Sequence, residues 1–203
     1  MIDAFVFDLG NVLYLFDLEI AMEYLKKEGC SINLLNQLQL KGILTKYELG
    51  KISTEEFYET AKGVIKLNAD FETFRQIFCG IFHENTDTVP LARRLAALRP
   101  VYILSNTNRM HAEFLSERYP ILSEARGRVY SFEEGVMKPE KRIFEIAIHR
   151  FNLNPRATLY IDDIKENTDA AATLGFKTLH YPVKNGRPIL RLQEELTRLG
   201  VRV

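Results

Sequence analysis

Short apolar runs that end in polar or turn residues recur along the chain and predict the strands of one sheet. The runs are Ala4–Phe7, Val101–Leu104, Val129–Ser131, Thr158–Ile161 and Lys177–His180. Apolar runs of this length, bounded by turn residues, are typical of strands that are buried on both faces of a parallel sheet.

The segment between Asp17 and His83 differs, because its apolar positions follow a helical period throughout. Ser53 and Glu56 form a capping-box signature, and Asp17 and Asp70 are suited to N-cap positions. The expected helices run from Asp17 to Gly29, Ile32 to Leu40, Ser53 to Val64 and Asp70 to Phe82. A helix-only block of this length exceeds a simple crossover. We therefore predict a small all-α cap over residues 16–87, inserted after the first strand.

Beyond residue 88 the predicted strands alternate with helical segments. The expected helices cover residues 91–98, 109–118, 139–151, 165–174 and 188–199, with Pro139 in the first turn of its helix. Alternation of this kind favours an α/β fold, a Rossmann-like parallel sheet with helices on both faces. We expect residues 1–15 and 88–203 to form this core.

The amino-acid composition and charge limit the kinds of partner and location that we expect for this protein. The 203 residues contain 27 basic and 27 acidic side chains, so overall charge gives no reason to expect a nucleic-acid partner. No apolar run approaches the ~20 residues that span a membrane, and Asp3 and Asp8 occupy the place of a signal peptide. Cys30 and Cys79 lie far apart without metal-ligand spacing. We expect a cytoplasmic protein without membrane or nucleic-acid partners, either a monomer or a homodimer.

Polar side chains follow the predicted strands at the points where ligands bind in open α/β sheets. They are Asp8, Ser105 and the pair Asp162-Asp163, with Lys138 before a helix. A carboxylate can attack phosphorus, and separated carboxylates can hold Mg²⁺. A hydroxyl and an ammonium can bind the phosphoryl oxygens. Alone, each residue has an ordinary interpretation as a turn, surface or capping residue; together they predict phosphoryl transfer.

Four ordered motifs resemble those of the haloacid dehalogenase superfamily. They are Asp8-Leu9-Gly10-Asn11-Val12, Ser105-Asn106-Thr107, Lys138-Pro139, and Asp162-Asp163 followed by Asn167. The helical insert matches the position of that superfamily's cap. Ser105–His111 and Tyr47–Ser53 further resemble bacterial sugar-phosphate phosphatases of the α-D-glucose-1-phosphate phosphatase type.

The resemblance implies a Mg²⁺ site and a nucleophile. Asp8 would attack phosphorus and bind the metal ion, together with the Gly10 carbonyl and Asp163. Asp162 and Asn167 would support these ligands.

The resemblance also implies a phosphoryl-binding set, in which the substrate-binding residues would be Asn11, Ser105, Asn106 and Lys138. Lys138 would also restrain Asp8, and Asn106 would either contact phosphate or orient its neighbours. With Asp8, Ser105 and Lys138 make up the expected catalytic residues.

Gly10 departs from the superfamily pattern, which usually has an acid/base Asp two residues after the nucleophile. General acid–base catalysis is typically worth about 10²–10⁴-fold, so its absence matters. Three interpretations stay open. In the first, the substrate has a good leaving group that needs little protonation. In the second, Asp17, Glu48 or a water takes the place of the missing acid/base Asp. In the third, the protein is weakly active or non-catalytic.

The predicted function is a Mg²⁺-dependent phosphatase that hydrolyses a small phosphorylated metabolite, a sugar phosphate in first place, through an aspartyl-phosphate intermediate. The alternatives are a weakly active or non-catalytic phosphate-binding relative and a haloacid dehalogenase-type carbon–halogen hydrolase, against which the Asp162-Asp163 pair counts. A phosphomutase is the least favoured. Candidates to face the substrate from the cap side, each with a structural interpretation beside it, are Tyr14, Phe16, Tyr47, Glu48, Lys51 and His111.

Overall fold

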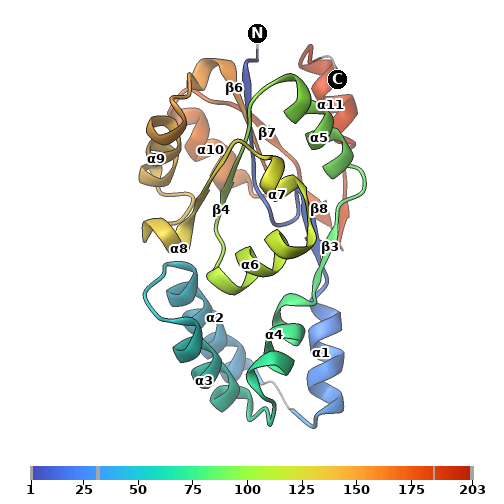
Figure 1. The fold of residues 1–203 in the computed structure, drawn as a ribbon, viewed down its shortest axis with the longest axis vertical. Helices are drawn as coiled ribbons and strands as arrows, with labels where there is room; N and C mark the ends of the chain where they lie inside the picture. The colour runs from blue at the N-terminus through green and yellow to red at the C-terminus, as the bar shows by residue number, and fades with distance from the viewer. Residues whose placement is uncertain (1, 31–32, 185, 202–203) are drawn as a thin grey trace.

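A computed structural model describes residues 2–30, 33–184 and 186–201 of the chain. A five-stranded parallel sheet forms its centre, with the order β5-β4-β1-β6-β7 (Figure 1). The strands are β1 (Ala4–Phe7), β4 (Val101–Ser105), β5 (Gly127–Tyr130), β6 (Thr158–Asp162) and β7 (Lys177–His180). Phe7 pairs with Ile103 on one side and Ile161 on the other, so the three central strands end at one level. The predicted Rossmann-like α/β fold is confirmed.

Successive side chains of the strands supply two apolar cores, one on each face of the sheet. Phe5 and Phe7 belong to one core, and Ala4 and Val6 to the other. The helices are α5 (Val89–Leu98), α6 (Arg109–Arg118) and α11 (Leu192–Arg198) on the first face, and α9 (Lys141–Phe151) and α10 (Lys165–Thr173) on the second (Figure 1). Because helices cover both faces of the sheet, side chains on both faces of each strand are apolar, and the strand sequences are continuous apolar runs.

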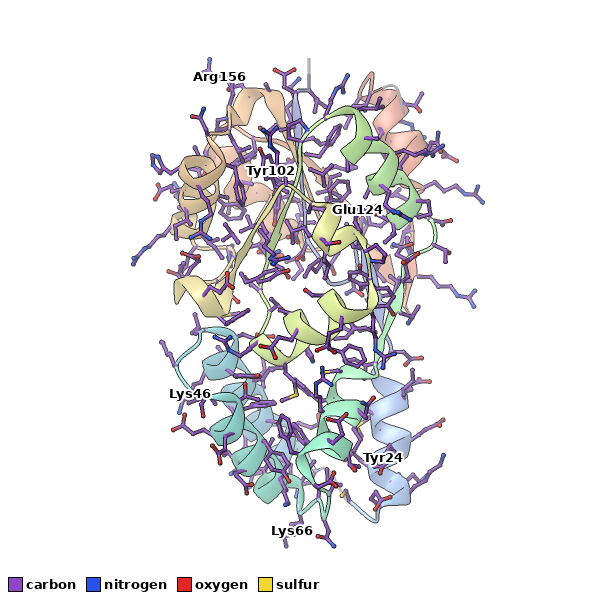
Figure 2. The ribbon with its side chains drawn as sticks, in the orientation of Figure 1. Tyr24, Lys46, Lys66, Tyr102, Glu124 and Arg156 are labelled. Carbon is purple, nitrogen blue, oxygen red and sulfur yellow. The ribbon has the colours of Figure 1, made fainter. Side chains whose placement is uncertain are left out.

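Aromatic packing closes the second core near its outer strand. Tyr102 of β4, labelled in Figure 2, stacks on Phe151 at the end of α9, with ring centroids 4.4 Å apart. Such pairs add to the stability that burial of apolar area provides.

Four helices pack together beyond the carboxyl ends of the central strands, at the lower end of Figure 1. They are α1 (Leu18–Lys27), α2 (Leu34–Glu48), α3 (Thr54–Ile65) and α4 (Phe71–Cys79). The predicted capping box is present: Glu56 N–H donates to Ser53 Oγ, and Ser53 N–H donates to Glu56 Oε2. Asp70 caps α4 as expected, since its Oδ1 accepts from Thr73 N–H at 2.8 Å.

An antiparallel ribbon that the sequence did not predict joins these helices to the sheet. Strand β2 (Tyr14–Phe16) pairs with β3 (Phe82–Glu84). The expectation that the helical period continues to His83 was wrong, because α4 ends at Cys79 and the chain then extends along β2. The rings of Phe16 and Phe82 pack edge to face across the ribbon.

Several helix ends also differ from the prediction. The second cap helix continues to Glu48, well beyond Leu40, while its predicted start at Ile32 lies outside the described residues. Pro139 lies before α9 rather than in its first turn, because Glu140 N–H donates to the Met137 carbonyl and closes a turn there.

The remaining elements are short. They are α7 (Ile121–Glu124), α8 (Ser131–Glu134), a 3₁₀ turn (Pro155–Ala157), β8 (Val183–Lys184) and β9 (Arg187–Pro188). Ser131, which was expected in a strand, begins α8, and Pro188, which was expected in the last helix, lies in β9. None of the helices in the described ranges is both long and apolar enough to cross a bilayer.

Candidate active site

Three acidic side chains meet at the carboxyl ends of β1 and β6. Asp8 directly follows β1, Asp162 ends β6, and Asp163 is the next residue. One carboxylate oxygen of each lies within 4.8 Å of the others. The parallel register explains the convergence, because β1 and β6 are hydrogen-bonded neighbours that end side by side.

Lys138 reaches this cluster from the loop before α9 and is 4% exposed. Its Nζ lies 2.9 Å from Asp8 Oδ1 and 2.7 Å from Asp162 Oδ2, and it donates to the Leu104 carbonyl at 3.1 Å. Burial acts to lower the pKa of Lys138, but the charges of Asp8 and Asp162 outweigh it and raise that pKa. The buried ammonium is therefore charged and fully partnered.

Asp162 is surrounded by donors. Its oxygens accept from Lys138, from the Tyr160 hydroxyl, from Asn167 Nδ2 at 3.0 and 3.1 Å, and from Ile164 N–H at 2.8 Å. Burial acts to raise the pKa of Asp162, yet Lys138 and the other donors hold it below its ordinary value. With both oxygens occupied, Asp162 is placed to hold Lys138 and less suited to bind a metal ion.

Asp8 and Asp163 each keep one oxygen without a hydrogen bond from the described residues. Asp8 Oδ1 accepts from Leu9 N–H at 2.7 Å as well as from Lys138, and Asp163 Oδ2 accepts from Asn11 Nδ2 at 2.9 Å. Burial raises the pKa of Asp8 to about 7 and also raises the pKa of Asp163. Two carboxylates that are desolvated beside a third are typical of a cation site.

The turn after Asp8 depends on Asn11, whose backbone has a φ of 57°. Asn tolerates this left-handed region better than most residues. The Asn11 N–H donates to the Tyr14 carbonyl at 2.7 Å, which closes the turn. The Asn11 amide thereby reaches Asp163, a contact between two predicted motifs that sequence did not suggest; contact of Asn11 with substrate stays a prediction.

Ser105 and Asn106 lie at the end of β4, where the phosphoryl group was predicted to bind. Ser105 is buried and lines the cavity described below. The Asn106 side chain bonds the Lys138 backbone at both ends, accepting from its N–H at 2.8 Å and donating to its carbonyl at 2.9 Å. These bonds tie Asn106 to the Lys138 backbone, and both roles expected for Asn106 stay predictions.

A cavity of about 350 Å³ lies between the sheet and the helical bundle. Gly10, Ser105 and Thr107 line its core side. Its remaining lining residues are Leu9, Phe16, Leu18, Ala21, Leu44, Glu48, Phe78, Ile81, Phe82, Asn106, His111 and Leu115. Apolar residues thus form most of the lining of the cavity.

The predicted cap-side residues divide into two groups. Phe16, Glu48 and His111 line the cavity, whereas Tyr14, Tyr47 and Lys51 do not. Tyr14 is buried in the core, where its ring lies 4.6 Å from that of Tyr119.

Two further residues stabilise the site and were missed in the sequence. Tyr160 could have been found, because it precedes Asp162 by two residues in one strand and so shares its face. Ser131 could not: its hydroxyl accepts from Thr107 N–H and donates to the Thr107 carbonyl, both at 3.0 Å, and only the fold brings them together. The His180 Nε2 atom also pairs with the Asp163 carbonyl, at 3.0 Å.

Comparisons with known proteins agree on one family. The family model for haloacid dehalogenase-like hydrolases matches residues 2–175. D-ribitol-5-phosphate phosphatase of Bacteroides thetaiotaomicron is 30% identical over 188 residues, which is 88% of this chain and 91% of that protein. The sesquiterpene phosphatase astK of Aspergillus oryzae is 27% identical over 181 residues, 87% of this chain and 88% of that protein.

Solved structures give the same result. A HAD family enzyme of Bacteroides thetaiotaomicron, crystallised with magnesium and inorganic phosphate, superposes with a TM-score of 0.81 at 27% identity. The match covers 89% of this chain and 94% of that one.

Proposed function

The chain belongs to the haloacid dehalogenase-like hydrolases, and on that premise we propose the substrate class and the role of each residue at its active site. The enzyme is a phosphoric monoester hydrolase with Mg²⁺ as cofactor, and it acts on a phosphorylated small molecule. We infer that this molecule is a small metabolite, with sugar and polyol phosphates first. The D-ribitol-5-phosphate phosphatase relative and the motif of residues 105–111 support that class.

The observation that carries the proposal is the arrangement around Asp8. A buried carboxylate lies with one oxygen held by Lys138 at 2.9 Å and Leu9 N–H at 2.7 Å, and the other without a bond from the described residues. We assign this second oxygen as the atom that attacks phosphorus. Attack forms an aspartyl phosphate, which water then hydrolyses.

The donor set fits Mg²⁺. Three carboxylates lie around one point with a single ammonium, so the cluster keeps a net negative charge. Asp8, the Gly10 carbonyl and Asp163 would supply the hard oxygen ligands that Mg²⁺ prefers. When bound, the ion would neutralise charge that develops on the phosphoryl oxygens.

Lys138 and Ser105 would hold the transferred group. The Lys138 ammonium is charged and positioned by Asp162 and by the Asn106 side chain, and a phosphoryl oxygen would replace one of the three acceptors that Lys138 now contacts. The Ser105 hydroxyl lies at the cavity wall and would donate to a phosphoryl oxygen. Asn167 keeps Asp162 in place.

An Asp8→Asn variant tests the assignment. We expect its Mg²⁺-dependent turnover of para-nitrophenyl phosphate to fall by at least about 10³-fold, because the amide is a poor nucleophile. Asp169→Asn on α10 makes the same chemical change in an exposed pair with Lys165, and it should keep wild-type turnover. Equal turnover by Asp8→Asn would refute the nucleophile assignment.

A panel of phosphorylated sugars, polyols, nucleotides and terpenoid alcohols, with and without Mg²⁺, would then identify the substrate class.

A further inference from the structure

A phosphate ester with a poor leaving group is hydrolysed faster when a proton reaches the oxygen that leaves, and the turn after Asp8 offers no acidic side chain beyond the nucleophile to supply it. Gly10 lines the cavity, and a Cβ added there would meet only the Phe16 ring, at an ordinary 3.5 Å. A Cβ at this position would therefore fit without a clash, but Gly10 has no side chain. General acid catalysis is worth about 10²–10⁴-fold, so another donor has a large effect.

Glu48 is the one carboxyl group among the described residues that line this cavity. It lies at the C-terminal end of α2, in the same cavity as Gly10 and Ser105 but on the cap side. Lys46, two residues earlier, points away from the molecule (Figure 2). Two residues correspond to rather more than half a helical turn, so the opposite directions of Lys46 and Glu48 follow from helix geometry.

The other titratable candidates are engaged elsewhere. His111 Nε2 donates to the Phe78 carbonyl at 3.2 Å, and its Nδ1 accepts from Asn108 Nδ2 at 3.0 Å. Burial lowers the pKa of His111 to about 4, so it stays neutral with both nitrogens occupied. Asp17 is exposed, caps α1 by accepting from Glu19 N–H at 2.9 Å, and is absent from the cavity wall.

The surroundings of Glu48 favour its protonated form. No hydrogen bond or ion pair joins its side chain to another described residue, and Leu44 and Phe78 line the cavity with it. Burial raises the pKa of Glu48 to about 7. A carboxyl group with that pKa can both give and regain a proton at neutral pH, which a general acid–base must do.

Its backbone is held against the core. The adjacent Tyr47 hydroxyl accepts from Met110 N–H at 3.1 Å at the start of α6 and pairs with Thr54 Oγ1 at 2.8 Å. Gly50 has a φ of 64°, and a Cβ there would lie 2.2 Å from the Phe132 carbonyl oxygen. The chain on both sides of Glu48 therefore touches the core, which fixes the residue relative to the site.

We propose that Glu48 is the general acid and base of this enzyme, acting on the leaving group from the cap side in place of a side chain at Gly10. The proposal rests on the proposed phosphatase function. As Asp8 forms its bond to phosphorus, the P–O bond to the leaving group breaks, and that oxygen takes the proton of Glu48. Glu48 then accepts a proton from the water that attacks the aspartyl phosphate. Inorganic phosphate leaves, and both carboxyl groups return to their starting forms.

The test compares Glu48→Gln with wild type on two esters, phenyl phosphate and para-nitrophenyl phosphate. Phenol is a poor leaving group and para-nitrophenol a good one. We expect kcat/KM to fall roughly 10²-fold with phenyl phosphate and only about threefold with para-nitrophenyl phosphate. A Gly10→Asp/Glu48→Gln double variant should recover at least about tenfold with phenyl phosphate, because residue 10 lines the cavity and a Cβ there meets only the Phe16 ring at van der Waals distance.

Glu59→Gln, an exposed change on neighbouring α3, is the matched control and should leave both rates unchanged. Equal losses on the two esters, or no loss with phenyl phosphate, would overturn the role of Glu48 while the phosphatase function stands. Absence of Mg²⁺-dependent hydrolysis of para-nitrophenyl phosphate by the wild type would instead overturn the proposed function, and this inference with it.

Discussion

In the core wall of the active site, by which we mean the strand-end residues around Asp8, Lys138 bonds to Asp8, Asp162 and the Leu104 carbonyl. In the cap wall, meaning the helical residues that line the cavity, Glu48 lies among apolar side chains without a described partner. Lys138 is buried and Glu48 is half-buried, and the loss of water affects the two groups differently. The core ammonium is stabilised as an ion by two carboxylates, and the cap carboxyl is stabilised in its neutral form.

The contrast teaches how the two walls divide the reaction. A network with every donor paired is rigid and suits groups that hold charge throughout the reaction. A carboxyl group without fixed partners can exchange its proton, so it suits a step in which a proton moves to or from the substrate. We infer that the core wall supplies the shared chemistry and that the cap wall supplies the individual features, including the fit of the leaving group.

Lys138→Met should have the largest effect on stability and activity, because it leaves Asp8 and Asp162 buried without their shared cation. We expect the free energy of unfolding to fall by roughly 3–5 kcal/mol, as when one member of a buried ion pair is removed. Turnover of para-nitrophenyl phosphate should fall by at least about 10³-fold. Urea unfolding and steady-state kinetics measure both.

Lys165→Met is the control for this change, because Lys165 forms an exposed pair with Asp169 that is worth only about 0–1 kcal/mol. If Lys138→Met were as stable and as active as Lys165→Met, the core wall would not depend on its ion network.

A pH-dependent effect on stability should follow from Glu48. Its pKa is about 7 in the folded protein and about 4.5 when unfolded, so the folded state binds the extra proton between these values. The stability that Glu48 contributes is therefore present at low pH and lost as pH rises toward 7. Relative to wild type, Glu48→Gln should gain about 1–3 kcal/mol at pH ~8 and less near pH ~5, in urea unfolding at each pH. A difference that does not vary with pH would show that the Glu48 pKa is unshifted.

The smallest expected effect comes from Tyr47→Phe, which removes the contacts of the Tyr47 hydroxyl with Met110 N–H and Thr54. We expect a loss of about 1–2 kcal/mol in the free energy of unfolding, because a buried N–H loses its acceptor. Turnover of phenyl phosphate should fall more than that of para-nitrophenyl phosphate, since Glu48 is the neighbouring residue.

Tyr24→Phe on α1 is the control for this change, because the Tyr24 hydroxyl has no described hydrogen bond. Figure 2 labels Tyr24. A larger thermal shift in Tyr24→Phe would contradict this account of the Tyr47 contacts.

Particular elements show which features the sequence could predict. The strand ending in Asp8 and the strand ending in Asp162 were recognisable as apolar runs, and parallel pairing then requires their ends to meet. The Ser53 capping box was equally recognisable, because it depends on residues three positions apart. The ribbon of β2 and β3 was not, since Phe82 continues a helical period and turns into a strand only because Phe16 lies beside it.

By itself, the sequence determined the α/β fold, the helical insert and the polar residues at the strand ends, because local periodicity and strand order are sufficient for these. Only the tertiary structure decided that Asn11 bonds Asp163, that Asn106 bonds the Lys138 backbone, and that Glu48 rather than Asp17 lines the cavity. The physical reason is that these contacts join segments far apart in the chain, and the direction of a side chain there depends on the packing around it.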